Sequence, residues 1–205
     1  KLLLKDASGI KIIGEASSGE QAFRFVREKK PQVVLLDIQL PDVSGLHIAQ
    51  KLLQQYPEIK IIVVTAALNN VFPARLLEIG VHGYFTKNTS QEELTKAIKA
   101  VHTGKRIITS QIANQLAVAN ATGQSSSIFD ALSHREMEVF LMTLSGIEIK
   151  GIANALHLSP KTVSTYRLNI FKKLKINTDA ELVLLAIKNK IIDGESIKNI
   201  SLESA

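Results

Sequence analysis

Asp37, Thr65 and Lys87 each stand at the end of a short apolar run, and together they carry the groups needed to handle a phosphoryl group. The runs are too short for helices and are followed by turn residues, which is typical of buried parallel strands. Such strands end at one edge of a sheet, where α/β folds hold their ligands. A carboxylate that accepts a phosphoryl group needs a hydroxyl and a cation beside the new anion. Asp37 taken alone is more often a residue that caps a strand, but the three strand ends together predict phosphoryl transfer to Asp37.

The N-terminal half of the chain alternates between strand and helix patterns. Strands are expected at residues 11–16, 33–37, 60–65 and 83–86. Helices are expected at residues 19–30, 46–56 and 73–79, and from the capping box Ser90-Gln-Glu-Glu93 onward. This alternation predicts a parallel sheet covered by helices on both faces.

The loop that follows Asp37 matches a known pattern. Its form, Asp-x-x-Leu/Met-Pro-x-x-x-Gly, is met by Asp37, Leu40, Pro41 and Gly45. With the later strand ends, it resembles the receiver domain of bacterial two-component response regulators. The resemblance implies an α/β flavodoxin-like fold, Asp37 as the phosphorylation site and a histidine kinase as the partner. It also implies Thr65 and Lys87 as phosphoryl ligands and Tyr84 as a rotating aromatic switch.

The receiver resemblance further implies a Mg²⁺ site, with the Asp37 carboxylate and the backbone carbonyl of Gln39 as metal ligands. Receivers complete this site with an acidic pair at the end of their first strand, and this sequence begins after that strand. Asp6 and Glu15 fall at other positions of the pattern and do not replace the pair. We therefore expect a parallel sheet with the first strand missing, a truncated chain, and an incomplete Mg²⁺ ligand set.

Residues 122–127, Thr-Gly-Gln-Ser-Ser-Ser, have the polar and turn-rich composition of a flexible linker. We expect a receiver domain at 1–106, a linker helix and flexible linker at 107–127, a second domain at 128–194 and a tail at 195–205. The linker offers no apolar anchor, so the two domains are expected to move independently. No strand pattern returns beyond it, which predicts an all-α second domain.

A helix-turn-helix is expected in the second domain. Its first helix opens at the capping box Ser133-His-Arg-Glu136. A short helix at about 149–156 is followed by Ser159, which suits an N-cap, and by Pro160, which suits the first helical turn.

The helix expected from Pro160 to about Leu174 has two faces, one apolar and one made of small polar and basic residues. No acidic residue lies between Glu148 and Asp179, and that window holds six basic residues. Lysine side chains can bind phosphates, and hydroxyls can form hydrogen bonds with base edges. The polar face could therefore bind in the major groove of DNA. A helix face of this composition is more often simply solvated; the preceding turn and the acid-free window favour DNA binding.

These patterns resemble the LuxR/FixJ-type (NarL-class) helix-turn-helix. The matching residues are Leu132-Ser133, Arg135-Glu136, Glu138-Val139, Gly146, Ile152-Ala153, Leu156, Leu158-Ser159, Lys161-Thr-Val163, Lys173-Leu174 and Glu181-Leu182. The sequence departs from the family at Gly151 and at Tyr166-Arg167, and the latter is similar to the GacA/LetA/UvrY branch of regulators. The resemblance implies a dimerisation helix at Asp179–Lys188. The implied DNA contacts are Lys150, Lys161, Thr162, Ser164, Thr165, Arg167, Leu168, Lys172 and Lys173.

Composition restricts the class of protein. The 205 residues are 45% hydrophobic, contain no Cys and carry a net charge of +6. Disulfides and thiolate metal sites are therefore excluded, and no apolar run approaches the roughly 18 residues of a membrane span. We expect a cytoplasmic protein without a membrane partner, and a modest positive charge compatible with a polyanion.

Three functional classes remain open. The first, which the motifs favour, is a DNA-binding transcriptional regulator controlled by phosphorylation of Asp37. The second is a DNA-binding regulator whose degenerate receiver serves protein interaction without phosphorylation. The third is an aspartyl-phosphate enzyme, but that class needs an Asp two residues after the nucleophile, where this chain has Gln39. The chain is therefore not expected to be an enzyme.

Overall fold

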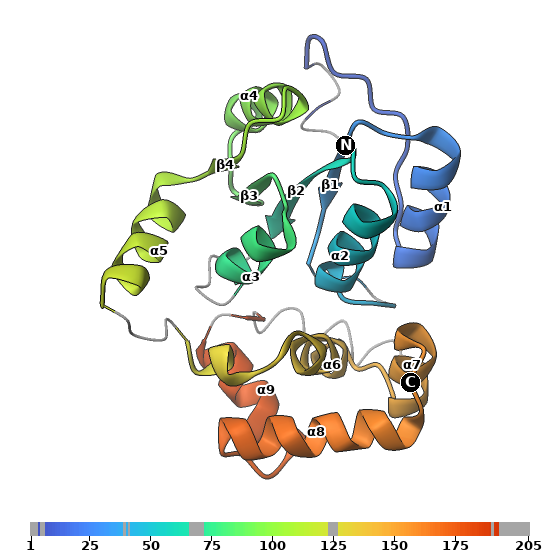
Figure 1. The fold of residues 1–205 in the computed structure, drawn as a ribbon, viewed down its shortest axis with the longest axis vertical. Coiled ribbons are helices and arrows are strands. Elements are labelled where there is room, and N and C mark those ends of the chain that lie inside the picture. Colours follow the sequence, from blue (N-terminus) through green and yellow to red (C-terminus); the bar gives the residue numbers. More distant parts are fainter. Residues whose placement is uncertain are drawn as a thin grey trace.

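The structure, a computed structural model, describes residues 4, 7–38, 40, 42–65, 72–122, 127–189 and 191–192 (Figure 1). The first domain holds α1 (Gly19–Lys29), β1 (Val33–Leu36), α2 (Gly45–Gln55), β2 (Lys60–Thr65), α3 (Phe72–Ile79), β3 (Gly83–Thr86), α4 (Gln91–His102), β4 (Ile107–Ile108) and α5 (Ser110–Thr122). The second holds η2 (Ile128–Ala131), α6 (His134–Leu144), α7 (Ile149–Leu156), α8 (Pro160–Leu174) and α9 (Asp179–Lys188). None of the helices in these ranges is long and apolar enough to cross a membrane.

One parallel sheet forms the centre of the first domain, with its four strands in the order β1-β2-β3-β4. β1 and β2 are rich in Val and Ile, which suits strands that are covered on both faces. A helix crosses over the sheet between each strand and the next, as parallel pairing requires. The expected receiver architecture is confirmed.

Residues 11–16 are not a strand, and this expectation was wrong. The segment is exposed and has no regular secondary structure, and among the described strands only β2 pairs with β1. A strand needs a neighbour to bind its N–H and C=O groups, and no described strand lies beside this segment. A suitable sequence pattern is therefore not sufficient to form a strand here.

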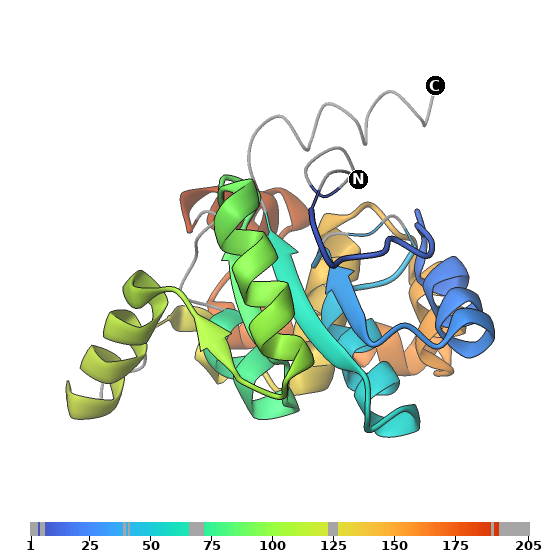
Figure 2. The same ribbon diagram turned by 90° about the horizontal axis from the view of Figure 1, so that it is seen from above.

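Alternate residues of β2 pack against opposite layers. Ile61 and Val63 belong to the cluster that contains the buried side chains of α2 and α3. Ile62 and Val64 pack with the buried side chains of α4. The two-residue period of a strand produces this separation. The result is a three-layer domain, and Figure 2 shows α4 lying across one face of the sheet.

The sheet continues past residue 106, where we placed the end of the receiver. The short strand β4 pairs with β3 through Gly83↔Ile107 and Tyr84↔Ile108. Ile112 on α5 is fully buried, so the expected linker helix is partly anchored to the body of the protein. The first domain thus includes more of the 107–127 segment than the sequence indicated; residues 123–126 lie outside the described part of the chain.

The second domain is all-helical, as expected. Its core includes Phe129 and Phe140, both fully buried, whose rings are 5.1 Å apart and tilted by 44°. Ser133 and Glu136 form the expected capping box at the start of α6, in which each side chain accepts from the other residue's N–H. Ser159 accepts from Thr162 N–H to cap α8, and Pro160 occupies its first turn.

The two domains are packed together rather than separate. A single buried cluster includes Ile48 and Leu52 of α2 together with Met137 and Val139 of α6. In Figure 1, α6 lies directly beneath α2 and α3. Independent domain movement was expected from the linker composition alone, and the structure is at odds with it because the faces of the domains bury apolar surface against each other.

Candidate functional site

The carboxyl ends of β1, β2 and β3 bring Asp37, Thr65 and Lys87 to one edge of the sheet. The Nζ atom of Lys87 lies 2.6 Å from Oδ2 of Asp37. The backbone N–H of Lys87 donates to the carbonyl of Thr65 at 2.8 Å, which holds the ends of β2 and β3 together. The side chains of Lys87 and Asp37 are 53% and 25% exposed, so the carboxylate is reachable from solvent. The structure therefore brings these three strand ends together as the sequence indicated.

Close backbone packing explains why the motif that follows Asp37 has a glycine at position 45. Its N–H donates to the carbonyl of Ile38 at 2.8 Å. A Cβ at this position would lie 2.1 Å from the backbone oxygen of Asp37, far closer than any side chain tolerates. Only glycine lets the first turn of α2 approach the loop this closely. Gln39 and Pro41, which belong to the same motif, lie outside the described residues.

Asp42 is a structural carboxylate that the sequence did not reveal. Its two oxygens accept from the N–H of Gly19, each at 2.9 Å, and one of them accepts from the N–H of Glu20 at 3.3 Å. The N-terminus of α1 favours a negative charge, so Asp42 acts as a long-range cap for that helix. No local pattern identifies such a cap because it lies 23 residues from its partner.

The described residues do not form a complete Mg²⁺ site. They contain no group of three His, Asp or Glu side chains that could hold a metal ion. Asp37 is bound to Lys87, and Asp42 is bound to the amides of α1. Mg²⁺ needs near-octahedral oxygen coordination, usually with one or two carboxylates. Both described carboxylates near the end of β1 are thus already in contact with protein groups.

Tyr84, the expected aromatic switch, lies inside the core. It is fully buried in the middle of the sheet, next to α2 and α3 in the main cluster. Within the described part of the chain, its hydroxyl has no hydrogen-bond partner. Burial raises the pKa of Tyr84 well above its ordinary value, so the phenol is neutral. The structure therefore holds this side chain in an inward position.

Tyr84→Phe is expected to leave the free energy of unfolding unchanged or to raise it by up to about 1 kcal/mol, because it removes an unsatisfied buried hydroxyl and keeps the ring. Urea denaturation of the two proteins, followed by circular dichroism, measures the difference. Destabilisation of the Phe variant by more than that amount would show that the hydroxyl makes a bond in solution.

The helix α8 carries the expected DNA-facing stripe on its outer side. Lys161, Thr165 and Lys172 are exposed, Ser164 is half-buried, and Leu168 is 68% exposed. The opposite side is buried through Val163, Ile170 and Leu174. These positions follow from a helical period in which residues three, four and seven apart share a face. Lys150 is exposed on the neighbouring helix α7.

Two hydroxyls of α8, those of Ser164 and Thr165, are already used as donors. Ser164 Oγ donates to the carbonyl of Pro160, and Thr165 Oγ1 donates to that of Lys161, each at 3.0 Å. Thr162 Oγ1 lies 2.8 Å from Oγ of the capping Ser159. Ser164 and Thr165 therefore present oxygen lone pairs outward, which suits the amino groups of adenine or cytosine.

Arg167 and Lys173, two of the expected DNA contacts, are held by carboxylates of their own domain. Nη2 of Arg167 donates to Oδ2 of Asp179 at 2.6 Å, and its guanidinium lies 5.9 Å from the centre of the Phe171 ring. Nζ of Lys173 lies 2.6 Å from Oε2 of Glu136. These ion pairs attach α8 to α9 and to α6, a role that sequence reasoning missed.

Two protein families account for most of the chain. Residues 1–99 match the response regulator receiver domain. Residues 130–186 match the bacterial regulatory proteins of the luxR family. The order of the two matches is that of the two domains described above.

Full-length relatives show the same organisation. The chain is 43% identical to the response regulator GacA of Pseudomonas aeruginosa, over 95% of this chain and 91% of that protein. It is 37% identical to the response regulator UvrY of Escherichia coli, over 96% and 91%. A LuxR-family response regulator from Aurantimonas is 28% identical and superposes with a TM-score of 0.55, over 58% of this chain and 86% of that one.

Solved structures also match the fold as a whole. The RcsB response regulator of Salmonella typhimurium covers 90% of this chain and 88% of its own, with a TM-score of 0.71 and 22% identity. Receiver domains as a family use Mg²⁺ for phosphorylation, and regulators of this kind are DNA-binding proteins rather than enzymes. The chain therefore belongs to the family of two-component response regulators that includes GacA and UvrY, with a receiver domain followed by a LuxR-type DNA-binding domain.

Proposed function

We propose that Asp37 is the phosphoacceptor of this response regulator and that a partner histidine kinase is the phosphodonor. The observation that carries the proposal is the ion pair of Asp37 with Lys87 at the edge of the sheet where β2 also ends in Thr65. In the reaction, a carboxylate oxygen of Asp37 attacks phosphorus, the bond from phosphorus to the donor histidine breaks, and the imidazole leaves. The Lys87 ammonium then compensates part of the new negative charge, with the Thr65 hydroxyl as a hydrogen-bond donor to the phosphoryl oxygens.

The second part of the proposal is that α8 reads double-stranded DNA from the major groove. Lys161 and Lys172 would contact phosphates, since both are exposed and lie within the acid-free window. Ser164 and Thr165 present acceptor oxygens, and Leu168 presents an apolar surface that suits the methyl group of thymine. Lys150, Thr162, Arg167 and Lys173 complete the set of proposed contacts.

We further propose that the protein binds DNA in the cytoplasm as a homodimer through α9. Leu184 on this helix is 65% exposed and offers an apolar side chain that the same helix of a second copy would cover. A symmetric dimer would bring two copies of α8 to two half-sites of one operator.

A second candidate function is DNA binding that does not depend on phosphorylation. It is favoured by the outer face of α8, on which Lys161, Thr165 and Lys172 are exposed although the receiver packs against the same domain. The two candidates differ in one measurable property, the change in DNA affinity when a phosphodonor is added. A phosphorylation-dependent regulator shows such a change and loses it in Asp37→Asn.

Substitutions on α8 test the DNA-binding assignment. Thr165→Ala is expected to lower the penalty for a base-pair change by about 1 kcal/mol at one position of the site. Lys172→Ala is expected to weaken binding to all sequences and to lower the slope of log K against log salt by about 0.9, the value for one phosphate contact. Fluorescence anisotropy on specific and random duplexes at several salt concentrations measures both effects.

The control for Lys172→Ala is Lys29→Ala, which removes the same charge from an exposed position on α1 of the receiver. It is expected to leave both the affinity and the salt slope unchanged. Equal losses on specific and random DNA for Thr165→Ala and Lys172→Ala would contradict the separate roles of these residues.

A further inference from the structure

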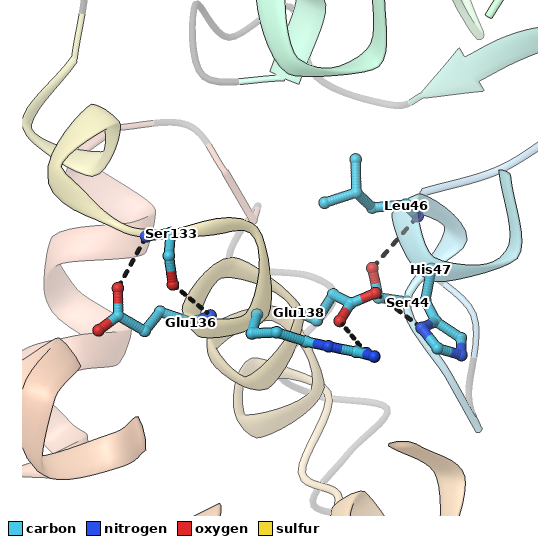
Figure 3. A network of polar contacts seen from close by, with 7 residues as sticks. Ser44, Leu46, His47, Ser133, Glu136 and Glu138 are labelled. Atoms are coloured by element: carbon cyan, nitrogen blue, oxygen red, sulfur yellow. Dashed lines mark hydrogen bonds and ion pairs between the residues drawn. The ribbon is translucent and has the colours of Figure 1, made fainter. Parts of the chain in front are cut away.

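A histidine and a glutamate from the two domains meet in the interior (Figure 3). Nδ1 of His47, in the first turn of α2, lies 2.6 Å from Oε1 of Glu138 on α6. Their side chains are 5% and 1% exposed, so water is largely excluded from the contact. Nη1 of Arg135 donates to the other carboxylate oxygen at 2.7 Å. Burial acts to raise the pKa of Glu138, but its bonds with His47 and Arg135 outweigh burial and hold that pKa below its ordinary value.

Arg75 makes a second polar contact between the domains. It lies on α3, is 8% exposed, and donates through Nη2 to the carbonyls of Phe129 at 2.7 Å and Leu132 at 2.6 Å. Leu132 is the C-cap residue of η2, so these bonds fix the turn that leads into α6. Burial lowers the pKa of Arg75 against the attraction of nearby carboxylates, and the guanidinium remains charged at physiological pH.

The first of these contacts begins next to the proposed phosphoacceptor. The N–H of Gly45 donates to the carbonyl of Ile38, and the backbone oxygen of Asp37 leaves no room for a Cβ at Gly45. The Asp37 loop therefore rests directly on the first turn of α2, which also carries His47. Because close-packed groups move together, a shift of this loop is passed on to His47.

On its other side, α6 is attached to α8. Glu136, two residues before Glu138, lies 2.6 Å from Nζ of Lys173 on α8 and accepts from the N–H of Ser133 at 2.7 Å. In Figure 1, α6 lies between the receiver helices and α8. Glu138 thus connects α6 to the receiver, and Glu136 connects α6 to α8.

The outer face of α8 stays open in this arrangement. Leu168 is 68% exposed, and Lys161, Thr165 and Lys172 are exposed as well. Figure 1 shows α8 on the side of the second domain that is remote from the sheet. The receiver therefore contacts the DNA-binding domain without covering its proposed DNA-facing stripe.

A cleft of about 330 Å³ lies between the same helices of the two domains. It is lined by Gln50, Leu53, Gln54, Glu78, Ile79 and His134. The two domains thus leave an open cleft beside their buried contacts.

We propose that His47, Glu138, Arg135 and Arg75 form a latch, called here the α6 latch, which sets the orientation of the DNA-binding domain relative to the Asp37 loop while leaving α8 free to bind DNA. The receiver then acts on the position of α8, not on its accessibility. The second half of this inference rests on the proposed function, because it takes α8 as the DNA-reading helix.

A charge introduced into the latch provides the test. His47→Glu places two carboxylates in contact and is expected to open the interface, whereas His47→Gln keeps a neutral hydrogen-bond donor beside Glu138 and is expected to leave it closed. The chain contains no Cys, so Lys29→Cys and Asn154→Cys introduce one spin label at an exposed position of each domain. Electron paramagnetic resonance then measures the distance between α1 and α7, and circular dichroism verifies that each variant is folded.

The distances between the labels test whether the α6 latch sets the orientation of the DNA-binding domain. The parent protein is expected to give one narrow distance distribution, His47→Glu a broader and longer one, and His47→Gln the parent distribution. Arg75→Ala is a second, independent way to open the latch and is expected to broaden the distribution as well. A narrow parent distribution that persists in both folded variants, His47→Glu and Arg75→Ala, would overturn the latch.

DNA affinity tests whether the closed latch leaves α8 free to bind DNA. Binding to a random-sequence 30-base-pair duplex at low salt is expected to be equal within about twofold for the parent protein and His47→Glu, since α8 is open in both. A gain of about tenfold on opening would show that the closed form covers α8, and would overturn this half. If Lys172→Ala binds the duplex as the parent does, the proposed function of α8 fails, while the label distances still report on the latch.

Discussion

Asp37→Asn is expected to abolish phosphoryl labelling of this receiver, because no other described carboxylate stands at the strand end beside Lys87. The phosphoryl group adds about two negative charges and Lys87 compensates one, so a divalent cation is needed for the transfer. Labelling is therefore expected to depend on added Mg²⁺.

Labelling with radioactive acetyl phosphate compares the parent protein with Asp37→Asn, each with and without Mg²⁺. Asp42→Asn is the control, since that carboxylate binds the amides of α1 rather than Lys87, and it is expected to retain the label. Label that does not depend on Mg²⁺ would contradict the metal argument. Label that survives Asp37→Asn would contradict the choice of phosphoacceptor.

Phe140→Ala is expected to cost about 3–5 kcal/mol of the free energy of unfolding, because it leaves a cavity in the centre of the second domain. Phe140 is fully buried, and its ring contacts that of Phe129 at a centroid distance of 5.1 Å. Both α6 and the turn that Arg75 holds depend on this contact, so DNA binding is expected to fall together with stability. Urea denaturation followed by circular dichroism and anisotropy on duplex DNA measure the two losses.

The control for Phe140→Ala is Leu168→Ala, which also removes a large apolar side chain but from a position that is 68% exposed. Its effect on the free energy of unfolding is expected to be within about 0.5 kcal/mol, while DNA binding is weakened through a lost base contact. Equal destabilisation by the two substitutions would mean that Phe140 is not a core residue in solution.

Local patterns in the sequence were sufficient for most of the helices and strands. The cap of α8 by Ser159 and Pro160 and the capping box of Ser133 with Glu136 involve residues no more than three positions apart. β2 and β3 begin and end at the expected residues because apolar runs and turn residues act over the same short range. The position of Asp37 near Lys87 also followed, since parallel strands end at one edge.

The contacts between distant parts of the chain were decided by the tertiary structure alone. Residues 11–16 have a strand pattern and form no strand, because pairing depends on a neighbouring strand and not on the segment itself. Nothing near His47 in the sequence indicates Glu138, which lies 91 residues away. Burial determines which polar groups lose water and must find partners, and burial depends on how the helices pack. Sequence patterns therefore determined the elements and the candidate chemistry, whereas packing determined how the domains are joined.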